Sequence, residues 1–318
     1  MRFLARRLFQ LLAVLLLVTF FTALLIEMLP GDPVQTIAPF ADDEQRQELR
    51  EDLNLDDPLI VRYGAWLGGF VSGDLGDYYA VQSKRPVMDD VKSAMPVSLL
   101  LMVYAQTFAL AVAIPFGVFS AYRAGTTLDK LGSATAFALI AIPNFVLAYI
   151  LQYYIGVKLG WLPVSGYTEA SVNYPEHVKS MILPTLTLAV GQIAIYMRLL
   201  RSDMIATLQE DYITMAKSKG VPASGVLWRH ALRPSSLTLL TVAGLNVGTL
   251  IGGALIIEVL FQLPGIGQLI YEAIGARQYV ALQSMVALIA VGYVIINFFV
   301  DLLYAVLDPR IRHARALG

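Results

Sequence analysis

The sequence predicts an all-α integral membrane protein with six transmembrane helices. Hydrophobic residues make up 57% of the 318 residues and charged residues 15%, whereas soluble domains are roughly 25% charged. Six separate segments are apolar over the roughly twenty residues that a helix needs to cross a bilayer. They lie at 8–29, 97–121, 132–156, 182–200, 237–260 and 284–307, and we expect 1–318 to form one membrane domain.

The first apolar segment must be distinguished from a secretory signal peptide, because three arginines precede it. Its run of about twenty-two apolar residues exceeds the seven to fifteen of a signal peptide. The Pro30-Gly31-Asp32-Pro33 sequence that follows has no small-x-small cleavage site. We therefore expect 8–29 to remain as a membrane helix.

The positions of Lys and Arg predict that both termini are cytoplasmic. With the N-terminus inside, the inner segments hold thirteen Lys and Arg residues, whereas the two short outer loops hold only Lys158, Lys179 and Arg277. This asymmetry follows the positive-inside rule. The long segment 30–96 is then an extracytoplasmic insertion, and it is acidic, with thirteen Asp and Glu against six Lys and Arg. Its composition alone is that of a solvated spacer, with a polar surface helix over 42–53.

A polar segment between the fourth and fifth spans contains a short predicted helix. Glu210 and Asp211 lie at its start and Lys219 in its last turn, so both charge signs complement the helix dipole. Gly220 is the expected left-handed terminator, and Pro222 prevents continuation of the helix. The pattern predicts a surface helix of about nine residues, outside the membrane.

The small residues of this helix allow two interpretations. Ala216 and Gly220 are four residues apart and share one face without bulk, which leaves a notch for the surface of another protein. An ordinary amphipathic connector would have the same spacing. Spacing alone leaves open whether the cytoplasmic loop 201–236 is a docking loop.

Uncharged polar residues occur at membrane depth in several spans. They are Gln106, Asn144, Gln152, Gln192 and Asn246. Such groups usually face protein or a water-filled cavity, and they suit a hydrated or zwitterionic solute because they offer hydrogen bonds without trapping a charge. Pro143 removes a backbone donor beside Asn144 and predicts a kink there. Simple packing irregularity is the alternative interpretation of that kink.

The fifth span adds two features to a candidate translocation path. Gly244, Gly248 and Gly252 recur every four residues and form a smooth stripe, which is either a packing seam or a pore wall. Glu258 is expected at the outer end of the span, where water is close. The candidate path consists of Asn144, Gln192, Asn246, Gly248 and Glu258.

Some residues bear on chemistry that the chain is not expected to perform. Asp301 is deep in the last span and is either an ion site or a satisfied interhelical contact. Pro184 is expected in the first turn of its helix, where its missing N–H costs little. The chain has no cysteine, and its three histidines lack metal-ligand spacing. We therefore predict no catalytic residue, no metal site and no nucleic-acid partner.

Several motifs resemble one known family. They are Asp211-Tyr212-Ile213, Ala216-x-x-x-Gly220, the run Arg229-His230-Ala231-Leu232-Arg233-Pro234, and the run from Glu258 to Gly267. These resemble the permease subunits of bacterial ABC importers, in particular the first permease of the dipeptide, oligopeptide and nickel group. Leu29 to Pro33 and Gly73 to Asp77 resemble the same branch, so the similarity covers the full length. Thr214-Met215 stands where the family consensus has Glu-Ala.

The resemblance implies a type I ABC-importer, MetI-like transmembrane domain. In that family the cytoplasmic loop carries the EAA coupling helix, which fits a groove on the ATPase. The corresponding residues here are Glu210, Asp211, Tyr212, Met215, Ala216, Lys219 and Gly220. The turn with Pro264, Gly265 and Gly267 would help to close the outer gate. The insertion would be a small cap that contacts the extracytoplasmic binding protein.

The energy source is expected in another polypeptide. No lysine follows a glycine, so the phosphate-binding pattern G-x-x-x-x-G-K-[ST] is absent. ATP and Mg would bind to partner ATPase subunits, and this chain would bind no cofactor. The implied assembly in the bacterial plasma (inner) membrane adds a homologous second permease, two ATP-binding subunits or one fused ATPase, and an extracytoplasmic binding protein.

Dipeptides or short oligopeptides are the favoured solutes, with nickel chelates, oligosaccharides, glutathione and haem as alternatives within the same family. A secondary transporter coupled to ions through Asp301 or Glu258 is the alternative from another class, and it predicts more charged midspan positions. An intramembrane enzyme is disfavoured because no H-E-x-x-H motif is present. A non-transporting scaffold would explain the docking loop but not the polar residues at depth.

Overall fold

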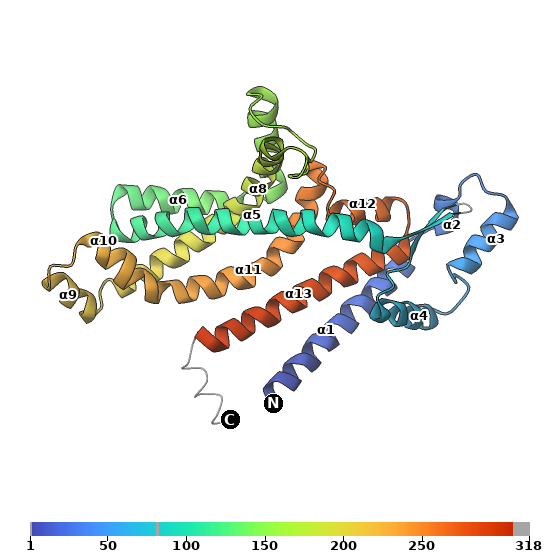
Figure 1. Cartoon of the computed structure of the whole chain (residues 1–318), viewed down its shortest axis with the longest axis horizontal. Helices are drawn as coiled ribbons and strands as arrows, with labels where there is room; N and C mark the ends of the chain where they lie inside the picture. Colours follow the sequence, from blue (N-terminus) through green and yellow to red (C-terminus); the bar gives the residue numbers. More distant parts are fainter. Residues whose placement is uncertain (1, 81–82, 308–318) are drawn as a thin grey trace. The chain divides into compact units, whose positions relative to one another are not determined.

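The computed structural model describes the backbone of residues 2–80 and 83–307 and the side chains of residues 9–80 and 83–300. In this part of the chain, five helices are long and apolar enough to cross a membrane, and one bent helix pair makes a sixth span if it is counted as one. The five are α1 (Arg2–Glu27), α5 (Val87–Tyr122), α8 (Tyr174–Thr207), α11 (Leu232–Phe261) and α13 (Tyr279–Leu307), shown in Figure 1. The predicted all-α membrane class is confirmed.

Two of these helices begin well before the apolar segments that predicted them. α5 starts at Val87 rather than near 97, and α8 starts at Tyr174 rather than near 182. Their first turns are polar, so a hydropathy pattern misses them although the helix continues. The expectation that Pro184 lies in a first turn is therefore wrong, because Pro184 lies inside α8.

The predicted third span is broken into two helices. α6 (Thr127–Ala141) and α7 (Asn144–Leu151), which continues into the π-helical η1 (Gln152–Lys158), meet at an angle of 102°. Ile142 is extended, with ψ of 120°, because the ring of Pro143 disfavours the helical region for the residue before it. α7 then starts afresh, with its first amides bonded to the Pro143 carbonyl. The kink predicted at Pro143 is thus a full break.

The chain divides into two compact units, which we name after their main features. The insertion unit is Met1–Ser98 with Pro264–Ile295, and the bundle unit is Leu99–Leu263 with Ile296–Gly318. Within the bundle unit, α6, α7 and α11 all pack on α8. The core of this unit draws on α5, α8 and α11, and Tyr196, Leu200 and Leu239 are fully buried in it.

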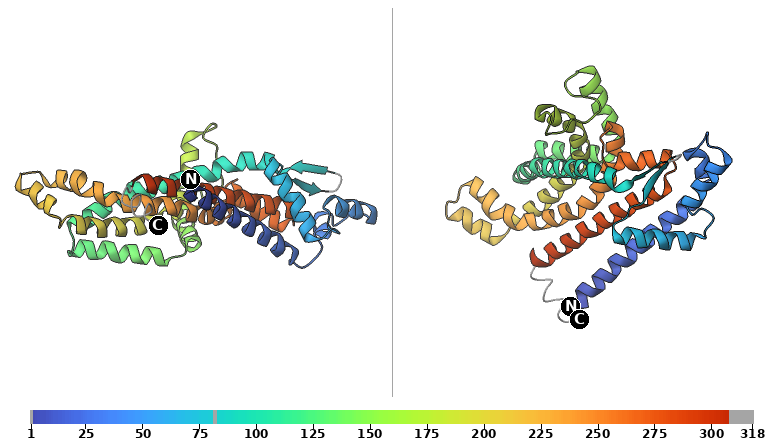
Figure 2. Two further views of the ribbon diagram at one scale, coloured as in Figure 1. Left: turned by 90° about the horizontal axis from the view of Figure 1, so that it is seen from below. Right: turned by 45° about the vertical axis from the view of Figure 1, so that its right-hand side comes forward.

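The two ends of the bundle unit carry different connections, as Figures 1 and 2 show. One end has the α5–α6 turn together with three short helices. These are α9 (Asp211–Ser218), α10 (Ala223–Gly225) and η2 (Val226–Ala231). At the other end, the loop after η1 meets the end of α11, where Gly166 N donates to Phe261 O at 2.9 Å.

A buried ion pair fixes the α5–α6 turn to α8. Arg201 donates from Nε to Asp129 Oδ1 at 2.5 Å and from Nη2 to Oδ2 at 2.6 Å. Ser120 Oγ and Gly125 N donate to the same carboxylate at 2.6 and 2.9 Å, and the Asp129 side chain is only 2% exposed. The carboxylate therefore has the additional hydrogen bonds that a buried ion pair needs to offset its desolvation.

The insertion unit contains α1, the first parts of α5 and α13, and several short elements. These are α2 (Pro33–Ile37), α3 (Asp43–Asp52), α4 (Leu59–Ser72), β1 (Asp77–Ala80), β2 (Ser83–Pro86) and α12 (Ile266–Gly275). α3 agrees with the helix predicted over 42–53. Its start is a capping box, in which Asp42 Oδ1 accepts from Gln45 N at 2.8 Å and Gln45 Oε1 accepts from Asp42 N at 3.2 Å.

The antiparallel hairpin of β1 and β2 was not predicted, and one side chain joins it to the start of α13. Tyr79 N donates to Gln278 Oε1 at 2.9 Å, and Gln278 Nε2 donates to Tyr79 O at 2.7 Å. The amide thus pairs with the open edge of β1 as another strand would. Leu75, Ala281 and Met285 are buried in the core beside it.

The Asp129–Arg201 pair supports a stability prediction. Asp129→Asn removes the charge that compensates Arg201, and we expect a loss of roughly 3–5 kcal/mol. Replacing both residues, Asp129→Leu with Arg201→Met, should recover most of this loss because no charge remains buried. The measurement is the temperature at which the detergent-solubilised protein loses its folded, monodisperse form. Lys179→Gln, which breaks an exposed pair with Glu176, is the control and should leave that temperature unchanged.

Equal losses for the single and the double replacement would contradict the prediction. They would show that the packing of these side chains, rather than their charge, holds the α5–α6 turn.

Candidate functional site

α9 is the short helix predicted in the polar segment between α8 and α11. It ends at Ser218, and Gly220 follows with φ of +78°. Gly220 N donates to Lys217 O at 3.0 Å and Val221 N donates to Ala216 O at 3.2 Å, which is the pair of bonds of a Schellman cap. The helix and its terminator are as predicted.

One face of α9 is part of the core of the bundle unit. Ile213 is fully buried and belongs to the same cluster as Met204 of α8 and Val226 of η2. Ala216, one turn later, is only 8% exposed. The notch predicted at Ala216 is therefore not open to another protein. Its small side chain instead lets α9 lie close against the chain itself, which corrects the interpretation made from spacing.

α8 and α11 are tied together at the base of this segment. Thr207 Oγ1 lies 2.9 Å from Ser235 Oγ, and Ser235 Oγ donates to Ala231 O at 2.9 Å. Thr207 is therefore the donor between the two helices. The segment that contains α9 therefore starts and ends at two helices that are hydrogen-bonded to each other.

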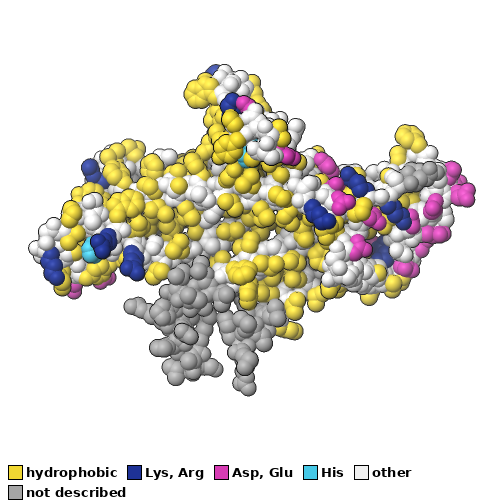
Figure 3. All heavy atoms as spheres, in the orientation of Figure 1, with side chains coloured by type: hydrophobic (Ala, Val, Ile, Leu, Met, Phe, Trp, Pro, Cys, Tyr) yellow, Lys and Arg dark blue, Asp and Glu magenta, His cyan; other side chains and the backbone are white. Residues whose placement is uncertain are grey.

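The opposite face of α9 is open to a partner. The predicted coupling residues other than Ala216 are all exposed, namely Glu210, Asp211, Tyr212, Met215, Lys219 and Gly220. Met215 is 57% and Tyr212 43% exposed. Desolvation and the nearby charge of Glu210 raise the pKa of Tyr212. Lys and Arg side chains gather over the α9–η2 end of the bundle unit (Figure 3).

Several polar residues predicted at membrane depth form one hydrogen-bonded chain in the bundle unit. Asn246 Nδ2 donates to Gln192 Oε1 at 3.0 Å, and Gln192 Nε2 donates to Thr249 Oγ1 at 3.4 Å. The Tyr196 hydroxyl donates to Gln106 Oε1 at 3.1 Å and is also hydrogen-bonded with Asn246. This polar chain links α5, α8 and α11.

Tyr196 is the member of the polar chain that sequence analysis missed. It is fully buried, and an aromatic residue in an apolar segment is normally a core residue. The available signal was spacing, because Tyr196 follows Gln192 by four residues and so shares its face of α8.

The break at Pro143 brings Asn144 to the α8–α11 contact. A Cβ on Gly191 of α8 would lie 3.9 Å from Asn144 Oδ1, and one on Gly253 of α11 would lie 3.8 Å from Asn144 Nδ2. Asn144 therefore lies in contact range of both α8 and α11. The structure places Asn144, Gln192 and Asn246 along the same helix contact.

Gln152 and Glu258 have surroundings that differ from those predicted. Gln152 Nε2 donates to Val164 O and to Leu260 O, both at 3.0 Å, so it fastens the loop after η1 to the end of α11. Glu258 is fully buried, which corrects the expectation that water lies close to it. The end of α11 is covered because the chain turns back there, with Leu263 N donating to Glu258 O at 2.9 Å.

The glycine stripe of α11 is a packing surface at one end. A Cβ on Gly244 would lie 2.9 Å from Cγ2 of Val300 in α13, and Gly248 is buried. Gly252 faces open space. Packing therefore accounts for Gly244, whereas a role of Gly248 in a path remains a prediction.

The predicted outer turn leads into α12 of the insertion unit. Gly265 precedes α12 as its N-cap residue, and Gly265 and Gly267 are buried while Pro264 is exposed. Ile266 N donates to Ser98 Oγ of α5 at 2.9 Å. The turn is thus fixed to α5, and its role in a gate remains a prediction.

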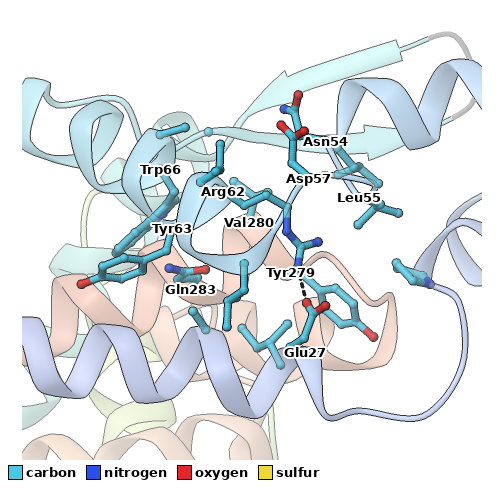
Figure 4. A pocket seen from close by; sticks show the side chains of 18 of the residues that line it. Glu27, Asn54, Leu55, Asp57, Arg62, Tyr63, Trp66, Tyr279, Val280 and Gln283 are labelled. Carbon is cyan, nitrogen blue, oxygen red and sulfur yellow. Dashed lines mark hydrogen bonds and ion pairs between the residues drawn. The ribbon is translucent and has the colours of Figure 1, made fainter.

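A cavity of about 380 Å³ in the insertion unit was not predicted. Figure 4 shows Arg62 of α4 directed at Glu27 of α1, with Tyr63 and Trp66 on another side. Sequence analysis did not find this cavity, because its walls come from segments far apart in the chain.

Asp301 lies outside the residues whose side chains are described. Among the described residues, no cluster of three His, Cys, Asp or Glu could hold a metal.

The structure has helices that are long and apolar enough to cross a membrane, and polar side chains within them are hydrogen-bonded to one another. A short exposed helix lies at one end of the bundle unit. These features are those of the membrane subunit of a transporter. The chain belongs to the family of binding-protein-dependent transport system inner membrane components. The family model matches residues 113–313, and the model of the family's N-terminal part matches residues 1–101. The chain is thus a multi-pass, non-catalytic permease subunit of an ABC importer, and the ATPase resides in separate subunits.

Curated relatives match over nearly the full length. A probable peptide ABC transporter permease protein, y4tP of Sinorhizobium fredii, is 36% identical over 98% of this chain and 99% of its own. The dipeptide transport system permease protein DppB of Alkalihalophilus pseudofirmus is 34% identical over 97% and 98%. A chain of the inward-facing MetNI methionine ABC transporter has a TM-score of 0.57 at 17% identity, covering 71% of this chain and all of its own. That likeness supports the MetI-like fold.

The contact between Asn246 and Gln192 can be tested by a double-mutant cycle. We expect the replacements Asn246→Ala and Gln192→Ala to be non-additive, with a coupling free energy of about 0.6 kcal/mol and at most about 1.7 kcal/mol. The measurement is the free energy of unfolding of the subunit in SDS titrations. Ser236→Ala, at an exposed site on α11, paired with Gln192→Ala is the control and should show no coupling. Additivity in both cycles would exclude the contact.

Proposed function

We propose that this chain forms half of a translocation pathway for dipeptides or short oligopeptides, and that α9 is the element through which ATP-binding subunits drive it. The named functions of the peptide and dipeptide permease relatives support the solute class. The polar chain of α5, α8 and α11 supports a path of uncharged groups, because amides and hydroxyls can bond to a peptide backbone of any sequence. Asn144, Gln192 and Asn246 are the proposed lining residues.

The proposed assembly has a homologous second permease, two ATP-binding subunits or one fused ATPase, and an extracytoplasmic binding protein. ATP and Mg bind to the ATPase subunits in this scheme. The family name supports the binding protein as a partner, and the described half-pathway needs a second half. The proposed orientation is the one predicted from the positions of Lys and Arg, with both termini cytoplasmic. The α5–α6 turn and α9, which lie at one end of the bundle unit (Figure 1), then face the cytoplasm.

The two-sided packing of α9 is the observation that carries this proposal. Its inner face is held by the buried Ile213, while its outer face exposes Tyr212 and Met215. An aromatic ring and a flexible thioether are side chains enriched in the core of protein interfaces. A partner that pulls or pushes on the outer face therefore moves α8 and α11 through their contact at Thr207 and Ser235.

Substitutions on the two faces of α9 should have different effects. Tyr212→Ala with Met215→Ala removes the docking side chains, and we expect at least a tenfold loss of ATPase-subunit binding, which corresponds to about 1.4 kcal/mol. Ile213→Ala leaves the docking face in place but removes buried packing worth roughly 2–5 kcal/mol. It should retain binding and lower solute uptake per ATP hydrolysed. The measurements are co-purification of the subunits, ATPase activity and uptake in reconstituted vesicles.

Ser202→Ala, an exposed position on α8 outside α9, is the control and should change none of these quantities. Wild-type binding and uptake in the Tyr212→Ala, Met215→Ala variant would refute the docking role. The solute class is tested separately by uptake of a labelled dipeptide in a strain that lacks this chain. Uptake that is restored by the chain, and reduced by excess unlabelled peptide but not by glutathione or nickel chelates, supports peptides. The reverse pattern of competition would refute them.

A further inference from the structure

α4 packs against α1 within the insertion unit. Its Arg62 ion-pairs with Glu27, the last residue of the apolar span of α1 (Figure 4). Its Tyr63 hydroxyl lies 2.9 Å from Thr19 Oγ1 and 3.3 Å from Leu16 O. Because Arg62 and Tyr63 are consecutive, their side chains reach two points of α1 that are eight residues apart, and Tyr63 reaches the one deeper in the apolar span.

The contact of Tyr63 with Thr19 shows how far a side chain of α4 reaches along α1 from Glu27. Thr19 precedes Glu27 by eight residues, which is about 12 Å along a helix, and the hydrocarbon core is roughly 30 Å thick. On another side of α4, Trp66 Nε1 donates to Ser284 Oγ at 2.8 Å. Ser284 is the sixth residue of α13 and the first of the apolar segment predicted over 284–307. The Tyr63 hydroxyl thus has a partner well within the apolar segment of α1, where a polar group without one is costly, and the Trp66 N–H has a partner at the start of the apolar segment of α13.

The outward face of α4 has the chemistry of a lipid contact. At 100° per residue its exposed residues fall within an arc of about 140°. They are Ile60, Val61, Gly64, Ala65, Gly68, Val71 and Ser72. None is charged, and Ile60 and Val71 are 74% and 79% exposed. The one charged residue of α4, Arg62, turns away from this face toward Glu27.

The two helices that precede and flank α4 expose surfaces of opposite character, apolar in α1 and acidic in α3. α1, which spans the membrane, exposes an apolar face that includes Leu17 and Leu25, 56% and 63% exposed. α3, the helix before α4, exposes Asp43, Glu44 and Glu48 instead. The exposed surface of α4 resembles that of α1 and not that of α3, although α3 and α4 belong to the same predicted extracytoplasmic insertion.

We propose that α4 is embedded in the bilayer leaflet on the Glu27 side of α1, with Ile60, Val61 and Val71 against lipid acyl chains. The insertion then contains a membrane-anchored part, α4, between the acidic α3 and the β1–β2 hairpin. This arrangement keeps α3 and the hairpin close to the membrane surface. It also explains why the inner face of α4 contains Tyr63 and Trp66, residues that suit the boundary between water and hydrocarbon.

The chain has no cysteine, so single cysteines can report the surroundings of α4. Val61→Cys, Gly68→Cys and Val71→Cys are each labelled with a nitroxide in the complete transporter, with partner subunits free of reactive cysteine, in phospholipid vesicles. Paramagnetic resonance then compares collisions with oxygen, which enters lipid, and with a water-soluble nickel chelate. At all three positions we expect collisions with oxygen to exceed those with nickel several-fold. Glu44→Cys on α3 is the control and should show the reverse.

Two outcomes would overturn the proposal. Nickel access above oxygen access at these positions would place α4 in water, and low access to both would show that a protein surface covers it. A second measurement does not need labelling. Gly68→Lys, on the outward face where a Cβ would meet open space, should reduce the recovered transporter several-fold relative to Gly68→Leu, because a lysine is disfavoured in lipid and a leucine is not. Equal recovery of the two variants would also count against the proposal.

Discussion

Inside a bilayer no water is available for a polar group, and the arrangement of this chain depends on that constraint. The spans are helices because a helix satisfies its own backbone. Polar side chains within the spans form bonded sets, such as Gln192 with Asn246 and Tyr196 with Gln106. Gln152 likewise donates to two carbonyls where the chain is irregular. Each set joins different helices, so the same bonds that remove a polar penalty also fix how the helices of the bundle unit pack.

In the bundle unit, one helix contains residues of the polar chain and also the contact at the base of the α9 segment. α8 contains Gln192 and Tyr196 of the polar chain and, fifteen residues after Gln192, Thr207 at the base of the α9 segment. This separation is about 22 Å along an unbroken helix. The ion pair at Arg201 lies between the two and holds the α5–α6 turn to the same helix. α8 is thus one continuous helix from the polar chain to the base of the α9 segment.

The insertion unit differs from the bundle unit in the surfaces that its short helices expose. Its acidic side chains gather over α2 and α3 in Figure 3, while α4 turns its one charge inward and exposes only apolar or small residues and Ser72. The hairpin is held at its edge by Gln278. These short elements have little core of their own, so side-chain contacts with α1 and α13 give them a fixed place.

The sequence by itself determined the membrane class, the number of apolar segments, a kink at Pro143 and the α9 helix with its Gly220 terminator. Each of these depends on local hydropathy or on the stereochemistry of a few neighbouring residues. Only the tertiary structure decided which face of α9 is exposed, that Glu258 is buried, that Gln152 is a clamp and that Tyr196 joins the polar chain. Those properties depend on residues distant in sequence, because burial and hydrogen bonding are set by which helices meet and not by the order of residues within one of them.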